Sequence, residues 1–158
     1  MQQKFKLSIL LVWILCFEVI SFIIGFTSRP NNEWYNGLIK SEFTPPGYVF
    51  SIVWPILYVF LAIISYILWQ NREDHKRLSE LFGAQMILNW SWSPIFFIMQ
   101  RIDLALFVLL SIIVLNICIL YRSFTEKKIV FYLLVPYFIW ICFAGYLNFI
   151  LFWMNCCL

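Results

Sequence analysis

Long apolar runs separated by short charged islands dominate the hydropathy pattern of this chain. A helix needs about 20 residues to cross a bilayer, and the runs that reach this length cover Leu7–Phe26, Pro45–Gln70, Leu78–Gln100, Leu104–Arg122 and Ile129–Trp153. The runs lack the alternation of a strand, and a backbone in lipid must bond within itself, so helices are favoured over a barrel. The pattern predicts an all-α, polytopic membrane protein built as a bundle of five transmembrane helices.

The composition agrees with a protein that lies in a lipid bilayer. Hydrophobic residues make up 63% of the 158 residues, charged residues only 12%, and the mean hydropathy is +0.87. A soluble domain of this length does not need so much apolar surface. We expect one domain over residues 1–158, with no metal site, because no His and Cys spacing matches one. The net charge of +3 lies in loops and does not indicate nucleic-acid binding.

The basic residues are distributed unevenly between the two ends of the predicted bundle. Eight of the eleven fall on the side of the amino terminus, namely Lys4, Lys6, Arg72, Lys76, Arg77, Arg122, Lys127 and Lys128. The opposite side carries Arg29, Lys40 and Arg101. Because basic loops stay in the cytoplasm, we predict a cytoplasmic amino terminus and a long first loop, residues 27–44, on the other side.

A polar, aromatic segment leads from this loop into the second run. Pro45 and Pro46 are typical of a helix start, and Thr44 before them is a candidate N-cap. Trp34 and Tyr35 lie earlier in the loop. We expect the loop to fold back as a lid over an aromatic pocket.

Three of the predicted helices carry aromatic stripes at helical spacing. The stripes comprise Phe50, Trp54 and Tyr58; Asn89, Trp92, Ser93 and Phe96; and Trp140, Phe143, Ala144 and Leu147, followed by Asn148. Ordinary packing or an interfacial belt would explain a single stripe. Amides at membrane depth need partners, so Asn89 and Asn148 either bond across helices or line a cavity. Small residues beside indole walls suit a large planar, apolar ligand.

Two further features lie inside the apolar runs. Glu18 is either a neutral carboxyl bonded to a neighbouring helix or a group that handles protons or substrate. Pro55, Pro94 and Pro136 interrupt three runs. These prolines can kink the helices around a central pocket, and a simple distortion of the helices without a function would explain them equally well.

Several motifs resemble those of the tryptophan-rich sensory protein family, whose mitochondrial members are called translocator proteins or peripheral-type benzodiazepine receptors. The motifs are W-Y in the first loop, T-P-P-G, V-W-P-I-L-Y, L-N-W-S-W-S-P-I-F-F and L-L-V-P-Y-F-I-W-I-C-F-A-G-Y-L-N. They keep the family's order over roughly Trp34 to Asn148. The resemblance implies a bacterial five-helix membrane protein, often a homodimer, that binds porphyrins and isoquinoline-carboxamide or benzodiazepine-type drugs between its helices.

The resemblance also implies the residues of the ligand site. These are Tyr35, Pro45, Tyr48, Trp54, Asn89, Ser93, Phe96, Trp140, Phe143, Ala144 and Leu147. No cofactor is required, and the expected ligand is a porphyrin, either protoporphyrin IX or haem. Some bacterial relatives are reported to promote light-dependent breakdown of protoporphyrin IX, and Trp54 and Trp140 are the catalytic candidates if this chain does so.

The chain departs from the family pattern at two places. Ser41-Glu42-Phe43 stands where the family usually has P-x-W, which removes one loop tryptophan. Phe149 follows the last L-N, and no basic residue occurs after Lys128, so we expect no cholesterol recognition through the motif of the animal members.

Three functions are compatible with these observations. The first is a tetrapyrrole-binding sensor or regulator, the second an enzyme that degrades porphyrin oxidatively, and the third a transporter of small amphipathic molecules. The sequence shows no nucleophile–base pair, so an enzyme of this kind would depend on the photochemistry of its ligand.

Overall fold

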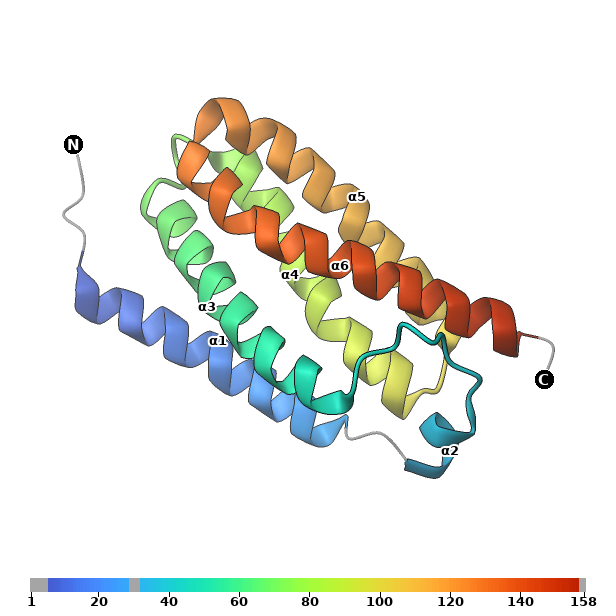
Figure 1. The fold of residues 1–158 in the computed structure, drawn as a ribbon. Coiled ribbons are helices and arrows are strands. Elements are labelled where there is room, and N and C mark those ends of the chain that lie inside the picture. Colours follow the sequence, from blue (N-terminus) through green and yellow to red (C-terminus); the bar gives the residue numbers. More distant parts are fainter. Residues whose placement is uncertain (1–5, 29–31, 157–158) are drawn as a thin grey trace.

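The computed structural model describes residues 6–28 and 32–156, and these form a bundle of helices (Figure 1). Four helices are long and apolar enough to cross a membrane: α1 (Leu7–Thr27), α3 (Gly47–Gln70), α5 (Ile102–Glu126) and α6 (Lys128–Asn155). The fifth crossing is formed by α4 (Lys76–Ser93) together with η1, a π-helical segment over Pro94–Ile98. The predicted five-helix membrane bundle is confirmed.

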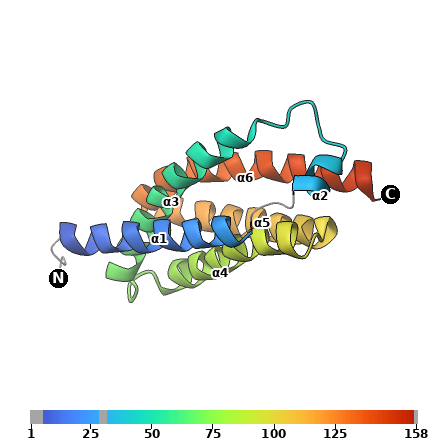
Figure 2. The same ribbon diagram turned by 90° about the horizontal axis from the view of Figure 1, so that it is seen from below.

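Helices α3 and α4 each contact three other long helices. Helix α3 packs against α1, α4 and α6, and α4 packs against α1, α3 and α5, while α5 also packs against α6. Helix α1 lies at the edge of the bundle, as both views show (Figures 1 and 2). Only 11% of its most apolar stretch is buried, so most of α1 presents apolar side chains outward.

Branched aliphatic side chains fill the space between α3, α4, α5 and α6. The fully buried ones include Leu61, Ile64, Leu78, Ile112, Ile119, Leu134 and Ile141. Lipid tails are as apolar as these side chains, so their burial adds van der Waals packing rather than a hydrophobic driving force. Polar contacts between helices therefore carry more of the specificity of this fold.

Proline affects the predicted helices unequally. Pro55 and Pro136 lie inside α3 and α6, which continue through them. At Pro94 the α-helical pattern of α4 ends, because proline lacks an N–H and crowds the preceding turn. The Met99 N–H instead donates to the Pro94 carbonyl at 3.0 Å, which closes the wider turn of η1.

The structure corrects three local predictions. Helix α3 begins at Gly47, with Pro46 at the N-cap position, so Thr44 is not the cap. The Thr44 N–H instead donates to the Ser41 carbonyl at 3.0 Å, so Thr44 belongs to a turn before the helix. The predicted first loop contains a short helix, α2 (Asn32–Gly37).

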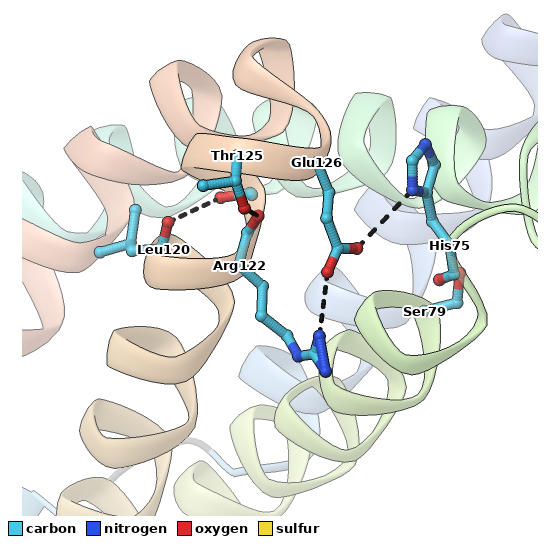
Figure 3. Close-up of polar contacts among 7 residues, drawn as sticks. His75, Ser79, Leu120, Arg122, Thr125 and Glu126 are labelled. Atoms are coloured by element: carbon cyan, nitrogen blue, oxygen red, sulfur yellow. Dashed lines mark hydrogen bonds and ion pairs between the residues drawn. The ribbon is translucent and has the colours of Figure 1, made fainter.

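The third correction concerns the connection between α5 and α6. The predicted runs end at Arg122 and begin again at Ile129, which leaves Ser123–Lys128 as a loop, but only Lys127 separates the two helices. The side chains of this last turn bond within it: Arg122 Nη1 donates to Glu126 Oε1 at 2.9 Å, and Thr125 Oγ1 donates to the Arg122 carbonyl at 3.0 Å (Figure 3). These contacts keep the charged segment helical.

One end of the bundle gathers most of the described basic residues. Here the α3–α4 connection meets the end of α5, with His75 Nδ1 3.6 Å from Glu126 Oε2 (Figure 3). The start of α1 lies at the same end, because the Lys6 N–H donates to Tyr66 Oη near the end of α3 at 2.9 Å. Helix α2, η1 and the end of α6 lie at the opposite end (Figure 1).

Candidate functional site

The aromatic stripes of α3 and α6 face each other. The Phe50 ring meets the Trp140 ring edge-on, with centroids 5.6 Å apart. Each stripe continues along its own helix: Trp54 contacts Tyr58 at 5.8 Å, and Trp140 contacts Phe143 at 5.8 Å. The α3 ring that contacts Trp140 is therefore that of Phe50, which lies one turn before Trp54. The indoles of Trp54 and Trp140 both pack against the same hydrophobic core.

A buried polar chain joins this aromatic face to α4. Tyr58 Oη donates to Asn89 Oδ1 at 2.7 Å, and Asn89 Nδ2 donates to Tyr137 Oη at 2.7 Å. Gln85 Nε2 also donates to Tyr137 Oη, at 2.6 Å. These contacts link α3, α4 and α6, so Asn89 bonds across helices, the first of the two roles we expected for it. We call Tyr58, Asn89, Tyr137 and Gln85 the polar chain.

A second polar link lies nearer η1. Trp92 Nε1 donates to Asn148 Oδ1 at 3.1 Å, and Asn148 Nδ2 donates to the Ile102 carbonyl at 3.2 Å. The Trp92 ring stacks on Phe96 with centroids 5.1 Å apart. Asn148 therefore also bonds across helices, and it ties α6 to α4 and to the start of α5.

Helix α2 covers the η1 end of the stripe on α4. Trp34 and Tyr35 contact Phe96 edge-on at 5.6 Å and 6.3 Å. Lys40 Nζ lies 4.5 Å from the centre of the Tyr35 ring, a cation–π contact. Burial raises the pKa of the Tyr35 phenol, so this hydroxyl stays neutral and can donate a hydrogen bond at physiological pH. The loop thus folds back against the bundle, and its role as a lid over an aromatic pocket stays a prediction.

The remaining candidates differ in burial. Phe96 and Leu147 are buried, while Pro45, Ser93, Phe143 and Ala144 are half-buried. Tyr48, in the first turn of α3, is 66% exposed. Most of the predicted ligand residues therefore lie on inward-facing surfaces of α3, α4 and α6, and Tyr48 lies outside them.

The indole N–H of Trp140 is one of six buried side-chain polar atoms without a hydrogen-bond partner in the described part of the chain, and the indole N–H of Trp90 is another. Trp140 Nε1 is buried, and none of the residues in 6–28 and 32–156 accepts its hydrogen bond. Buried donors in native proteins are nearly always paired, and this one lies on the face that carries Phe143 and Ala144. An acceptor on a bound molecule would satisfy it.

The carboxyl of Glu18 shows the same property. Within the described part of the chain its buried Oε1 has no hydrogen-bond partner. A neutral carboxyl bonded to a neighbouring helix was one of the two explanations that we offered for Glu18. For this oxygen atom, the structure shows no such bond.

Residues 10–154 of the chain match the TspO/MBR family. The chain belongs to this family. It is similar to the tryptophan-rich protein TspO of Archaeoglobus fulgidus, with 36% identity over 135 residues, which cover 82% of this chain and 85% of that protein. The protein of the same name from Chlorobaculum tepidum is 34% identical over 146 residues, covering 89% and 91%. The human translocator protein is 30% identical over 138 residues, covering 85% and 79%.

Sequence reasoning missed several residues of this candidate site. Tyr137 and Gln85, both fully buried, complete the polar chain but were not among the candidates. Tyr137 carried a usable signal, because a tyrosine in the middle of an apolar run must place its hydroxyl against a polar partner. Asn155, which bonds the first loop to α6, had no signal beyond its polarity.

Proposed function

We propose that this TspO/MBR protein binds a tetrapyrrole, such as protoporphyrin IX or haem, against the facing aromatic surfaces of α3 and α6. The buried, unpaired Trp140 N–H is the observation that carries the proposal. A porphyrin such as protoporphyrin IX or haem is a flat apolar ring with carboxylates at its edge. It can therefore stack on the aromatic stripes while a carboxylate oxygen accepts a hydrogen bond from the indole.

The surrounding side chains have distinct roles in this proposal. Trp54 and Trp140 provide flat apolar contact, and Ala144 leaves room beside Trp140. Tyr35 and Pro45 approach from the loop end, where Tyr35 already packs on Phe96. The same aromatic surface would accept drug-like isoquinoline carboxamides, which are also flat and carry a carbonyl acceptor.

The test is porphyrin titration of the purified protein in detergent, followed by tryptophan fluorescence in the dark. Trp140→Phe keeps a ring but loses the N–H, and Trp54→Phe loses part of the stacking surface. Each aromatic contact contributes on the order of 1 kcal/mol beyond area burial, so each variant should raise Kd about fivefold.

Trp69 supplies the matched control, because it lies on the same helix as Trp54. Its ring contacts Trp13 and Tyr66 near the basic end of the bundle, and its side chain is 46% exposed. Trp69→Phe should leave the porphyrin affinity unchanged. If all three variants lose affinity equally, the aromatic residues only hold the bundle together and the assignment of the site is wrong.

A second candidate function is light-dependent degradation of the bound porphyrin. It is favoured by the contact of Trp54 with Tyr58, since both rings are readily oxidised and their centroids are 5.8 Å apart. Loss of porphyrin absorbance in light but not in the dark, with a defined product, would support it. Trp54→Phe should then reduce degradation much more than it reduces binding. Stable bound porphyrin under illumination would favour the sensor, and uptake into liposomes would favour a transporter.

We also propose that the protein lies in a bacterial cell membrane with its amino terminus in the cytoplasm. The proposal is supported by the end of the bundle where His75 meets Glu126, because most of the described basic residues lie on the connections there. The tetrapyrrole site then opens toward the non-cytoplasmic side, where α2 lies. A homodimer is the oligomeric state we expect from the resemblance to the family.

A further inference from the structure

One side chain fastens the first loop to the end of α6. Asn155 Oδ1 accepts a hydrogen bond from the Ile39 N–H at 3.0 Å, and Asn155 Nδ2 donates to the Ile39 carbonyl at 3.0 Å. Asn155 Nδ2 also donates to the Leu151 carbonyl at 2.8 Å, which holds the amide in place on its own helix. Both backbone groups of Ile39 are thus held by a single amide.

The segment that contains Ile39 has few other anchors. We call residues 38–46, the non-helical connection from α2 to α3, the strap. Its other contacts with α6 involve Tyr146: Ser41 Oγ lies 3.4 Å from Tyr146 Oη, and the Phe43 ring lies 6.5 Å from the Tyr146 ring. Its remaining hydrogen bonds are internal, such as the Phe43 N–H to Ser41 Oγ at 3.2 Å, or join the adjacent helices, as Lys40 Nζ does with the Asn36 carbonyl of α2 at 3.5 Å and the Val49 N–H of α3 with the Pro46 carbonyl at 3.0 Å.

The strap lies beside the outer part of the helix that carries Trp140. It runs from α2, whose Tyr35 packs on Phe96, along the C-terminal part of α6 to the start of α3 (Figure 1). Its fixed points on α6, Tyr146 and Asn155, lie between Trp140 and the end of that helix. A molecule that enters the aromatic site from this end must pass the strap.

The strap is also held loosely enough to open by itself. Ile39 is 48% exposed and Phe43 is 71% exposed, so apart from Leu38, which packs against the cluster of Phe96, Ala105 and Leu151, little apolar surface fixes the segment. Each hydrogen bond at such a position contributes modestly, because water competes for both partners. Segments with few buried contacts open locally without unfolding the rest of the protein.

We propose that Asn155 is the latch of the strap, and that it sets the rates at which a tetrapyrrole enters and leaves the site. This inference rests on the proposed function. When the closed strap is the major state, loss of the latch raises the open fraction of the free and the bound protein by the same factor. The association and dissociation rate constants then rise together, and Kd stays nearly constant.

The experiment compares the full-length protein with Asn155→Ala in the same detergent. Stopped-flow mixing with protoporphyrin IX in the dark gives both rate constants, and each should rise about 10-fold when two exposed hydrogen bonds are lost. Hydrogen exchange of the Ile39 amide is a second readout that needs no ligand, and it should become faster. Asn155→Asp keeps the acceptor for the Ile39 N–H but loses the donor, so its rates should fall between those of the wild type and Asn155→Ala.

Asn36→Ala is the control, because Asn36 is an exposed asparagine in α2 of the same loop. It should leave the rate constants and the Ile39 exchange unchanged. The latch is wrong if Asn155→Ala leaves both rate constants at wild-type values, or if it raises Kd through the dissociation rate constant alone. If the wild type binds no porphyrin, the proposed function fails, and Ile39 exchange unchanged in Asn155→Ala would still overturn the latch.

Discussion

Tyr137 is the residue of the polar chain whose removal should cost the fold most. Its hydroxyl accepts hydrogen bonds from Gln85 Nε2 at 2.6 Å and from Asn89 Nδ2 at 2.7 Å, and its side chain is fully buried. Tyr137→Phe keeps the ring and its packing but leaves two amide donors without their acceptor. The perturbation therefore isolates the polar contribution of one oxygen atom.

The magnitude follows from the number of bonds and from the membrane environment. Hydrogen bonds between membrane helices contribute about 0.6 kcal/mol on average and at most about 1.7. Two of them give an expected loss of about 1–3 kcal/mol. Tyr58→Phe removes one bond of the polar chain, to Asn89 Oδ1, and should cost about half as much.

The assay is reversible denaturation in mixed micelles, with the free energy of unfolding read from tryptophan fluorescence. Tyr132→Phe is the matched control, since Tyr132 lies on the same helix and is 64% exposed. It should change the free energy of unfolding by less than about 0.5 kcal/mol. Equal effects of Tyr137→Phe and Tyr132→Phe would refute the claim that the polar chain holds α4 against α3 and α6.

Three further predictions concern the two ends and the outer surface of the bundle. Glu126→Gln removes the ion pair with Arg122. Because this pair is partly exposed, the free energy of unfolding should fall by less than about 1 kcal/mol, and a larger loss in the same denaturation assay would contradict this prediction. A reporter fused after Leu158 should be active only outside the cytoplasm, and cytoplasmic activity would reverse the proposed orientation. Gly83 and Ala84 are exposed on α4, so cysteines placed there should cross-link two copies in mild detergent, whereas recovery of monomer alone would argue against a dimer through this face.

The fold was predictable from the sequence because the membrane simplifies the problem. Apolar runs of sufficient length leave few alternatives to spanning helices, and the predicted ends fall within a few residues of α1, α3 and α6. The prediction was least accurate where charges lie inside a helix. The fourth run was predicted to end at Arg122, with Glu126 in a loop, but the i,i+4 pairing of these two residues stabilises one more turn of α5.

The site was less predictable, because periodicity gives the face of a helix but not its partner. The spacing of Phe50, Trp54 and Tyr58 indicated one stripe on α3, yet the residues of this stripe contact two different helices. Phe50 contacts Trp140 on α6, while Tyr58 bonds to Asn89 on α4. This division arises from the crossing of three helices, which no single run of sequence contains.

The hydrogen bonds of Asn89 bear on how a ligand would be recognised. The Asn89 oxygen accepts a hydrogen bond from Tyr58, and its nitrogen donates one to Tyr137. A ligand that bonded to both groups of this amide would have to break these hydrogen bonds at membrane depth, where no water replaces them. The Trp140 N–H carries no such cost, because the described residues offer it no acceptor. In the binding mode that we propose, the polar chain therefore fixes the positions of the helices, and polar recognition of the ligand falls to the indole. On this proposal, the residues that hold the fold and those that bind the ligand are different residues of one aromatic site, so the two sets can vary independently.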